Sequence, residues 1–419
     1  MTHPLEGLRV ADFSWFVAGP LAARTLADFG ADVIRVESET HVDGLRIVQP
    51  FPPGTDGLNV SGYFNNANAS KRSLLLNMSE PDARAVALRL IAASDVFITN
   101  FTPRVIERWR LTYDELRQIN PRIIALYAPM QGLSGPRKNF LGFGAVLTPI
   151  TGLNYLTGFA HRPPAGVGTN YPDYTINPGH SVVAIMAALR HRDRTGEGQM
   201  IELSQLESVA TTIAPALMDY AANGRVQTRR GNRSDWMAPH GAFRCLDEPR
   251  RHTPLPTQSA ERERWIVLAI RDDEDWRALC DVAGNAPFTQ DTLFQTLLGR
   301  KQNEDDLEQE INTWTGRQQA RAVVQRLQEA AVPAGIVQDA EDMLDHDEHL
   351  RERGYYVQLD HPETGLASHD GPVAKLHATP GALRSPAPLI GEHTYQVATE
   401  VLGYSPDEVA DLVAKGILA

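Results

Sequence analysis

Asp173 is the residue of this sequence best suited to covalent chemistry. It lies between Tyr171 and Tyr174 in the segment GVGTNYPDYTINPGHS, residues 166–181. Pro172 and Pro178 predict that this segment is an irregular loop, because proline lacks the N–H that a helix interior uses. A carboxylate on such a loop can attack a carbonyl carbon, since it is ionised at neutral pH and needs no separate base. The competing interpretation is an aspartate that caps its own loop through backbone amides.

The elements that follow Asp173 would hold it in place. Apolar residues recur at three- and four-residue spacing over 181–190, which predicts a buried helix. The turn TGEGQ, residues 195–199, contains two glycines and predicts the end of that helix, with a strand at 200–203. A long helix is expected over 205–223.

Strands and helices alternate through the first 130 residues. Strands are predicted at 8–13, 32–37, 74–77, 95–100 and 122–127, with helices at 21–29, 81–93 and 113–120. This alternation is typical of a doubly wound α/β domain with a parallel sheet. The turn WFVAGP, residues 15–20, lacks the G-x-G-x-x-G pattern of a dinucleotide site, so we expect a Rossmann-like fold without NAD. Residues 39–68 show no period and are predicted to be a long loop.

A second, smaller domain is expected after the first. Residues 225–239 are polar and arginine-rich, which indicates a linker. The apolar run WIVLAI, residues 265–270, predicts a strand, and helices are expected at 272–282, 307–314 and 317–331. This is the pattern of an α+β domain. The polar, proline-rich stretch at 247–264 is predicted to be a surface insertion.

Composition excludes several classes of partner. The 419 residues carry a net charge of -12, so the chain lacks the basic field that nucleic acid or anionic lipid requires. No apolar run approaches the roughly 20 residues that span a bilayer, and the N-terminus has no secretory pattern. We therefore expect a cytoplasmic protein without nucleic-acid or membrane partners. Cys245 and Cys280 lie far apart and His346 and His349 form at most half a site, so no metal is expected.

Five segments resemble the family III CoA-transferases, the family of formyl-CoA transferase and crotonobetainyl-CoA:carnitine CoA-transferase. One is the Asp173 segment with the TGEGQ turn. The others are the N-terminal motifs Asp12-Phe13, Ala18-Gly19-Pro20 and Gly30-Ala31-Asp32, the motif Asn100-Phe101-x-Pro103, the motif Asn120-Pro121-Arg122, and the C-terminal Pro388-Leu389-Ile390-Gly391.

The resemblance implies an enzyme in which Asp173 is the covalent nucleophile. Its substrates would be an acyl-CoA and a free carboxylic acid, with no permanently bound cofactor. It also implies an interlocked homodimer, a large CoA-binding domain over 1–224, a linker and small domain over 225–335, and a return to the large domain over 336–419. The CoA contacts that it implies are Phe16, Val17, Ala18, Lys71, Arg72, Leu76, Asn100, Phe101 and Arg108.

Two alternatives stay open on the same resemblance. An α-methylacyl-CoA racemase would need a histidine nine residues before Gly152, where this chain has Phe143. A non-catalytic CoA-binding partner subunit would have no need to keep Asp173. Oxyanion donors are expected either around Gly142–Gly144 or in the loop 230–232. The triplet Trp15-Phe16-Val17 is more apolar than its counterpart in formyl-CoA transferase, which predicts a bulky or aromatic acid.

Overall fold

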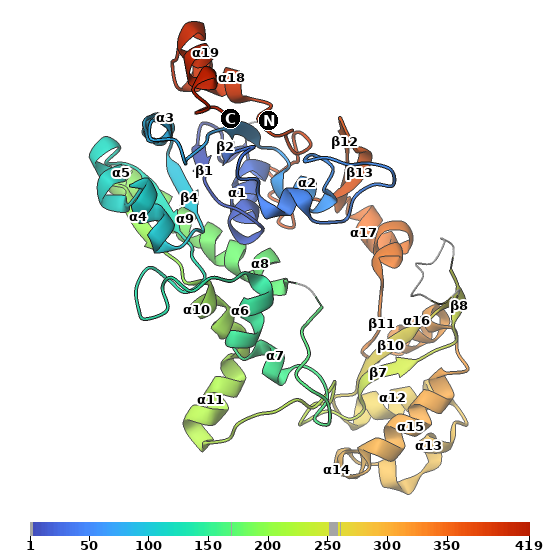
Figure 1. Ribbon diagram of the computed structural model, residues 1–419. Helices are drawn as coiled ribbons and strands as arrows, with labels where there is room; N and C mark the ends of the chain where they lie inside the picture. The colour runs from blue at the N-terminus through green and yellow to red at the C-terminus, as the bar shows by residue number, and fades with distance from the viewer. Residues whose placement is uncertain (1–2, 169, 251–258, 260) are drawn as a thin grey trace. The chain divides into compact units, whose positions relative to one another are not determined.

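The computed structural model describes residues 3–168, 170–250, 259 and 261–419 (Figure 1). It divides into two compact units. Unit 1 comprises Met1–Thr157, Pro164–Thr228 and Glu348–Ala419, and unit 2 comprises Gly158–Pro163 and Arg229–Asp347. The domain limits expected at 224/225 and 335/336 stay a prediction. The two units are defined by contacts within one chain, and such contacts do not test whether a segment folds by itself.

Unit 1 is built on a six-stranded parallel sheet with the strand order β3-β2-β1-β4-β5-β6. This confirms the expected parallel α/β architecture. The strands are β1 (Arg9–Asp12), β2 (Asp32–Glu37), β3 (Arg72–Leu75), β4 (Val96–Thr99), β5 (Ile124–Tyr127) and β6 (Gln199–Glu202).

Both faces of the sheet are covered because both faces of its strands are apolar. In β1, Val10 packs with α1 and α9 on one face, whereas Ala11 belongs to the core cluster with α3 and α5 on the other. Burial on both faces is what a parallel sheet requires. The helices before residue 200 are α1 (Ala18–Asp28), α2 (Gly62–Asn68), α3 (Ala83–Ala92), α4 (Pro103–Trp109), α5 (Tyr113–Ile119), α6 (Gly144–Ile150), α7 (Leu153–Leu156), α8 (Tyr171–Tyr174) and α9 (Ile176–Thr195).

The sheet reverses its winding direction between β1 and β4. From β1 the chain adds β2 and β3 on one side, and β4 is followed by β5 and β6 on the other. Open parallel sheets bind ligands outside the carboxyl ends of the strands at such a point. The loops that follow β1 and β4 are therefore where a ligand site is expected.

Three local predictions were wrong. Asp173 lies in the one-turn helix α8, and Pro172 and Pro178 each occupy the first turn of a helix, where a missing N–H costs nothing. Residues 39–68 contain a 3₁₀ helix, Gly44–Ile47, and α2. The long helix expected over 205–223 is divided into α10 (Gln205–Ala210), a 3₁₀ turn (Thr211–Ile213) and α11 (Ala214–Asn223), with Pro215 in the first turn of α11.

The last part of unit 1 adds a hairpin and short helices. These are α17 (Glu348–Glu352), the antiparallel pair β12 (Tyr356–His361) and β13 (Gly365–Asp370), α18 (Thr394–Gln396) and α19 (Pro406–Ala414). Val397 and Val409 from this part join the core on the α3 face of the sheet. No described helix is long and apolar enough to cross a membrane.

Unit 2 contains a three-stranded antiparallel sheet packed against helices, in the order β11-β10-β7. Its strands are β7 (His240–Arg244), β10 (Trp265–Ala269) and β11 (Ala334–Ile336), with a short pair β8 (Glu248–Pro249) and β9 (Glu261–Arg262). Its helices are α12 (Asp273–Ala283), α13 (Pro287–Gln290), α14 (Leu297–Gln302), α15 (Glu304–Thr315) and α16 (Ala320–Glu329). Half of the insertion predicted at 247–264 lies outside the described residues.

Candidate active site

Two neighbouring cavities lie where the sheet reverses direction. One, of about 290 Å³, is lined by Leu76 and Arg108 among others. The second, of about 270 Å³, is lined by Asp173. Trp15, Phe101 and Val105 line both cavities, so the two lie side by side, and we refer to them together as the groove. The loops after β1 and β4 supply residues to both cavities, as the sheet topology predicts.

An amide clamp joins those two loops. The side chain of Asn100 accepts the N–H of Trp15 at 3.0 Å and donates to the Trp15 carbonyl at 2.7 Å. Close packing at Gly19 supports the clamp, because a Cβ there would lie 2.4 Å from the Cβ of Ser14. The β1 loop is therefore held against the β4 loop by hydrogen bonds as well as by packing.

Asp173 lies almost buried at one end of the groove, with 6% of its surface exposed. Its carboxylate accepts the backbone N–H of Gly144, and it accepts the side-chain N–H of Asn177 at 3.2 Å. A Cβ on Gly144 would lie 2.3 Å from Asp173 Oδ2, so only glycine allows this approach. Burial raises the pKa of Asp173 to about 6, while the Asn177 and Gly144 donors lower it.

A chain of buried polar side chains fixes the Asn177 donor. Its side-chain N–H also approaches Gln205 Oε1 at 3.3 Å, and its Oδ1 accepts the hydroxyl of Ser208. Gln205 in turn donates to the carbonyl of Ala128 at 2.7 Å. Sequence reasoning missed Asn177 and Gln205. The only available signal was the four-residue spacing from Asp173 to Asn177, which matters once that segment is known to be helical.

Seven of the nine predicted CoA contacts line the groove. Phe16, Val17, Ala18 and Asn100 line the Asp173 cavity, Leu76 and Arg108 line the other, and Phe101 lines both. Ring contacts extend along the shared wall, since Phe101 packs edge-on against Trp15 at 5.1 Å and against Trp109 at 5.0 Å between ring centroids.

The structure places Lys71 and Arg72 elsewhere. The ammonium of Lys71 is buried and donates to Asp12 at 2.9 Å, the Pro20 carbonyl at 2.8 Å and Asn68 at 2.9 Å. These bonds use all three of its donors, so none is left for a phosphate. Arg72 begins β3 at the amino end of the sheet, where it forms an ion pair with Asp32 at 2.6 Å. The groove lies at the opposite, carboxyl end.

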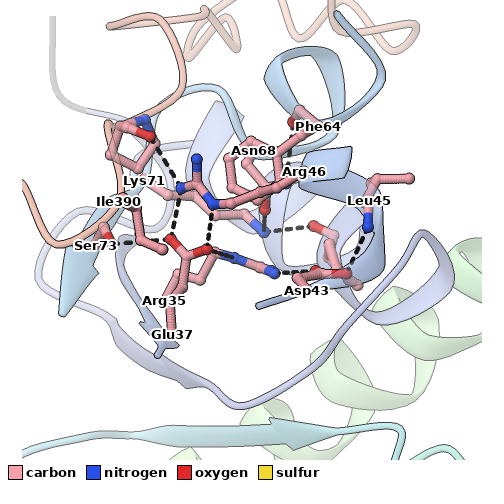
Figure 2. A network of polar contacts seen from close by, with 12 residues as sticks. Arg35, Glu37, Asp43, Leu45, Arg46, Phe64, Asn68, Lys71, Ser73 and Ile390 are labelled. Atoms are coloured by element: carbon pink, nitrogen blue, oxygen red, sulfur yellow. Dashed lines mark hydrogen bonds and ion pairs between the residues drawn. The ribbon is translucent and has the colours of Figure 1, made fainter. Parts of the chain in front are cut away.

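Lys71 belongs to a buried charge network (Figure 2) that is hydrogen-bonded to the backbone of the β1 loop. The network pairs three cations with three carboxylates. Its members are Asp12, Arg35, Glu37, Asp43, Arg46 and Lys71. Asp43 also accepts the N–H of Phe16 at 3.2 Å. Glu37 lines the cavity that contains Arg108, whereas no member of the network lines the Asp173 cavity.

The two loops predicted to supply oxyanion donors have glycine N–H groups with different acceptors. The Gly144 N–H donates to Asp173 itself. In unit 2, the Gly231 N–H is bonded to the Gly158 carbonyl at 2.7 Å. Within the described ranges, no group of three or more His, Cys, Asp and Glu side chains is arranged to hold a metal ion.

Comparison with known proteins agrees with this geometry. The chain is 30% identical over 420 residues to the succinyl-CoA–L-malate CoA-transferase beta subunit of Chloroflexus aurantiacus, covering 100% of this chain and 98% of that one. It is 31% identical to succinate–glutarate CoA-transferase of Agrobacterium fabrum, covering 95% and 96%. A crystal structure of a CaiB/BaiF family protein from Brucella suis superposes with a TM-score of 0.83 at 27% identity, covering 96% and 100%.

The family model for CoA-transferase family III matches residues 5–394, which include both cavities and Asp173. The chain therefore belongs to the family III CoA-transferases.

Proposed function

We propose that this enzyme moves CoA from an acyl-CoA to a free carboxylic acid through covalent intermediates on Asp173. The observation that carries the proposal is a buried carboxylate with neutral hydrogen-bond donors, at one end of a groove whose other end holds Arg108. An acyl-CoA has a reactive thioester at one end and phosphates at the other. Phosphates require a cation or N–H donors, which Arg108 can supply.

The environment of Asp173 suits a nucleophile. With a pKa of about 6, about nine-tenths of the carboxyl groups are ionised at pH 7. Neither recorded hydrogen-bond donor, Asn177 or Gly144, is charged, so no ion pair reduces the reactivity of the oxygen atoms. Burial also limits the access of water, which would hydrolyse an activated acyl group.

The proposed reaction balances without a net proton. Asp173 attacks the thioester carbonyl, the C–S bond breaks, and CoA leaves as a thiolate while a mixed anhydride forms. The thiolate then attacks the aspartyl carbonyl, which releases the donor acid as a carboxylate and leaves an aspartyl-CoA thioester. The acceptor carboxylate repeats these two steps in reverse, so its acyl-CoA is released and Asp173 is regenerated.

The relatives are named for succinyl-CoA, malate, succinate and glutarate. These names support the general reaction between an acyl-CoA and a carboxylic acid. We propose the same reaction class for this chain, in the homodimer that the family resemblance implies.

The racemase alternative has less support. Phe143, where a racemase would need its histidine, stacks on Phe16 with parallel rings 6.0 Å apart. A phenyl ring cannot remove and return an α-proton.

Steady-state kinetics with varied acyl-CoA and acid would test the proposal. We expect a new acyl-CoA to form with the parallel-line pattern of a ping-pong reaction. Deuterium incorporation at the α-carbon without acyl exchange would instead indicate a racemase. CoA binding without any turnover would indicate a partner subunit.

A further inference from the structure

The cavity around Asp173 has a charge pattern that distinguishes between classes of acid. Among the described residues that line it, Asp173 carries the only charge. The polar side chains of Asn100 and Gln205 already donate to the backbone carbonyls of Trp15 and Ala128. Apart from Thr102, the remaining lining residues are aromatic, aliphatic or glycine. The unit that holds the nucleophile thus presents an apolar wall to the acyl group.

Phe16 is fixed in this wall by its surroundings. Its φ is +60°, a left-handed conformation that is uncommon for an aromatic residue. The Asp43 carboxylate accepts its N–H at 3.2 Å, and a Cβ on Gly44 would lie 2.9 Å from its ring. A strained backbone persists only when neighbouring groups enforce it, and such strain is concentrated at functional sites. The neighbouring residues therefore fix the position of this ring in the cavity.

Phe143 extends the same apolar surface. It precedes α6 and stacks on Phe16, with ring centroids 6.0 Å apart and an angle of 6° between the planes. Although they contact each other, the two residues remain 40% and 52% exposed. A flat, apolar group bound in the cavity could cover these rings and gain both hydrophobic and ring-stacking contacts.

Building on the proposed function, we propose that the acyl group is that of a monocarboxylic acid with a flat or aromatic apolar body, bound by Phe16 and Phe143. The reacting carboxylate would face Asp173, and the body would lie against the two rings. A second carboxylate lying against the two rings would meet no cation in the wall that this unit supplies, so it would lose hydration without gaining a charged partner. Dicarboxylic acids would therefore be poor substrates.

The full-length enzyme can be tested with benzoyl-CoA, acetyl-CoA and succinyl-CoA as donors, and with benzoate and succinate as acceptors. We expect kcat/KM for benzoyl-CoA to exceed that for succinyl-CoA by about 100-fold. Phe143→Ala and Phe16→Ala should each lower benzoyl transfer at least about tenfold. They should lower acetyl transfer by a smaller factor, because an acetyl group has less apolar surface to bury against the rings. Tyr395→Ala removes an exposed aromatic residue outside the groove and is the matched control.

The outcomes separate this proposal from the one on which it rests. Efficient transfer that favours succinyl-CoA, or phenylalanine variants that lower acetyl and benzoyl transfer equally, would overturn the assigned substrate class and leave CoA transfer standing. The absence of transfer from every donor to every acceptor would overturn both. Phe143→Arg provides a further check, since placing a cation in the wall should raise succinyl transfer relative to benzoyl transfer.

Discussion

The pKa of Asp173 is shifted in the opposite direction to the pKa values of Asp12 and Glu37, two carboxylates of the buried charge network. Burial alone would raise the pKa of Asp12, but the charges of Lys71 and Arg35 outweigh it and lower that pKa. Glu37 behaves in the same way beside Arg46 and Arg35. Asp173 has only neutral donors, so burial prevails and its pKa rises to about 6. Asp43, the third carboxylate of the network, differs from Asp12 and Glu37, because burial outweighs the charge of Arg35 and raises its pKa. An adjacent cation therefore lowers the pKa of a buried carboxylate only where its charge outweighs the cost of burial.

Removing the reactive carboxylate should have the largest effect on activity. We expect Asp173→Asn to lower kcat by at least about 10⁴-fold, because no other group can carry the acyl chain. The variant should remain folded, since the ionised form of a buried group with a raised pKa destabilises the protein at neutral pH. Circular dichroism and thermal unfolding would verify the fold. A folded variant with substantial activity would rule out Asp173 as the nucleophile.

Breaking the network should instead affect stability. Lys71→Met leaves Asp12 buried without its closest cation, and such changes cost about 3–5 kcal/mol of unfolding free energy. Urea unfolding would measure the loss. Arg117→Met, which removes an exposed ion pair with Asp114, is the matched control and should cost less than about 1 kcal/mol. Equal losses in the two variants would contradict the structural role assigned to Lys71.

The role of Asn177, a neutral hydrogen-bond donor to Asp173, can be tested through the pH dependence of activity. Protonation makes Asp173 non-nucleophilic, so activity should fall as the pH drops through about 6. Asn177→Ala removes a donor that favours the ionised form, which should raise the pKa and move this limb to higher pH. We also expect a loss of about 10- to 100-fold in kcat/KM. A loss of activity with an unmoved limb would mean that Asn177 has only a packing role.

The smallest expected effects are on KM, and they should distinguish Arg108 from Arg72, the two arginines predicted to contact CoA. Arg108→Met should raise KM for the acyl-CoA about tenfold, because it removes a cation from the groove. Arg72→Met should leave KM within about twofold, since Arg72 pairs with Asp32 at the other end of the sheet. Comparable increases in KM for both variants would contradict the placement of CoA in this groove.

Local sequence patterns predicted the elements better than they predicted the site. The limits of β2 were correct to the residue, because Gly30 precedes a short run that is buried almost throughout. The start of α9 was missed because proline is acceptable in a first turn. Both outcomes depend on information within a few residues of the element.

Long-range partners were less predictable. Lys71 was expected to contact CoA, but its partner Asp12 lies in β1, nearly sixty residues earlier in the chain. The Gly144 N–H reaches Asp173 from a segment nearly thirty residues earlier in the chain. Neither contact produces a periodic pattern in the sequence, because each contact depends on which distant segments the folded sheet brings together.

The proposed mechanism requires that Asp173 carries CoA covalently. Incubation with benzoyl-CoA, followed by borohydride trapping and peptide mass spectrometry, would test this step directly. We expect a CoA adduct by intact mass, a reduced residue at position 173 after trapping, and neither signal in Asp173→Asn. Turnover without an adduct, or an adduct at another residue that persists in Asp173→Asn, would contradict it.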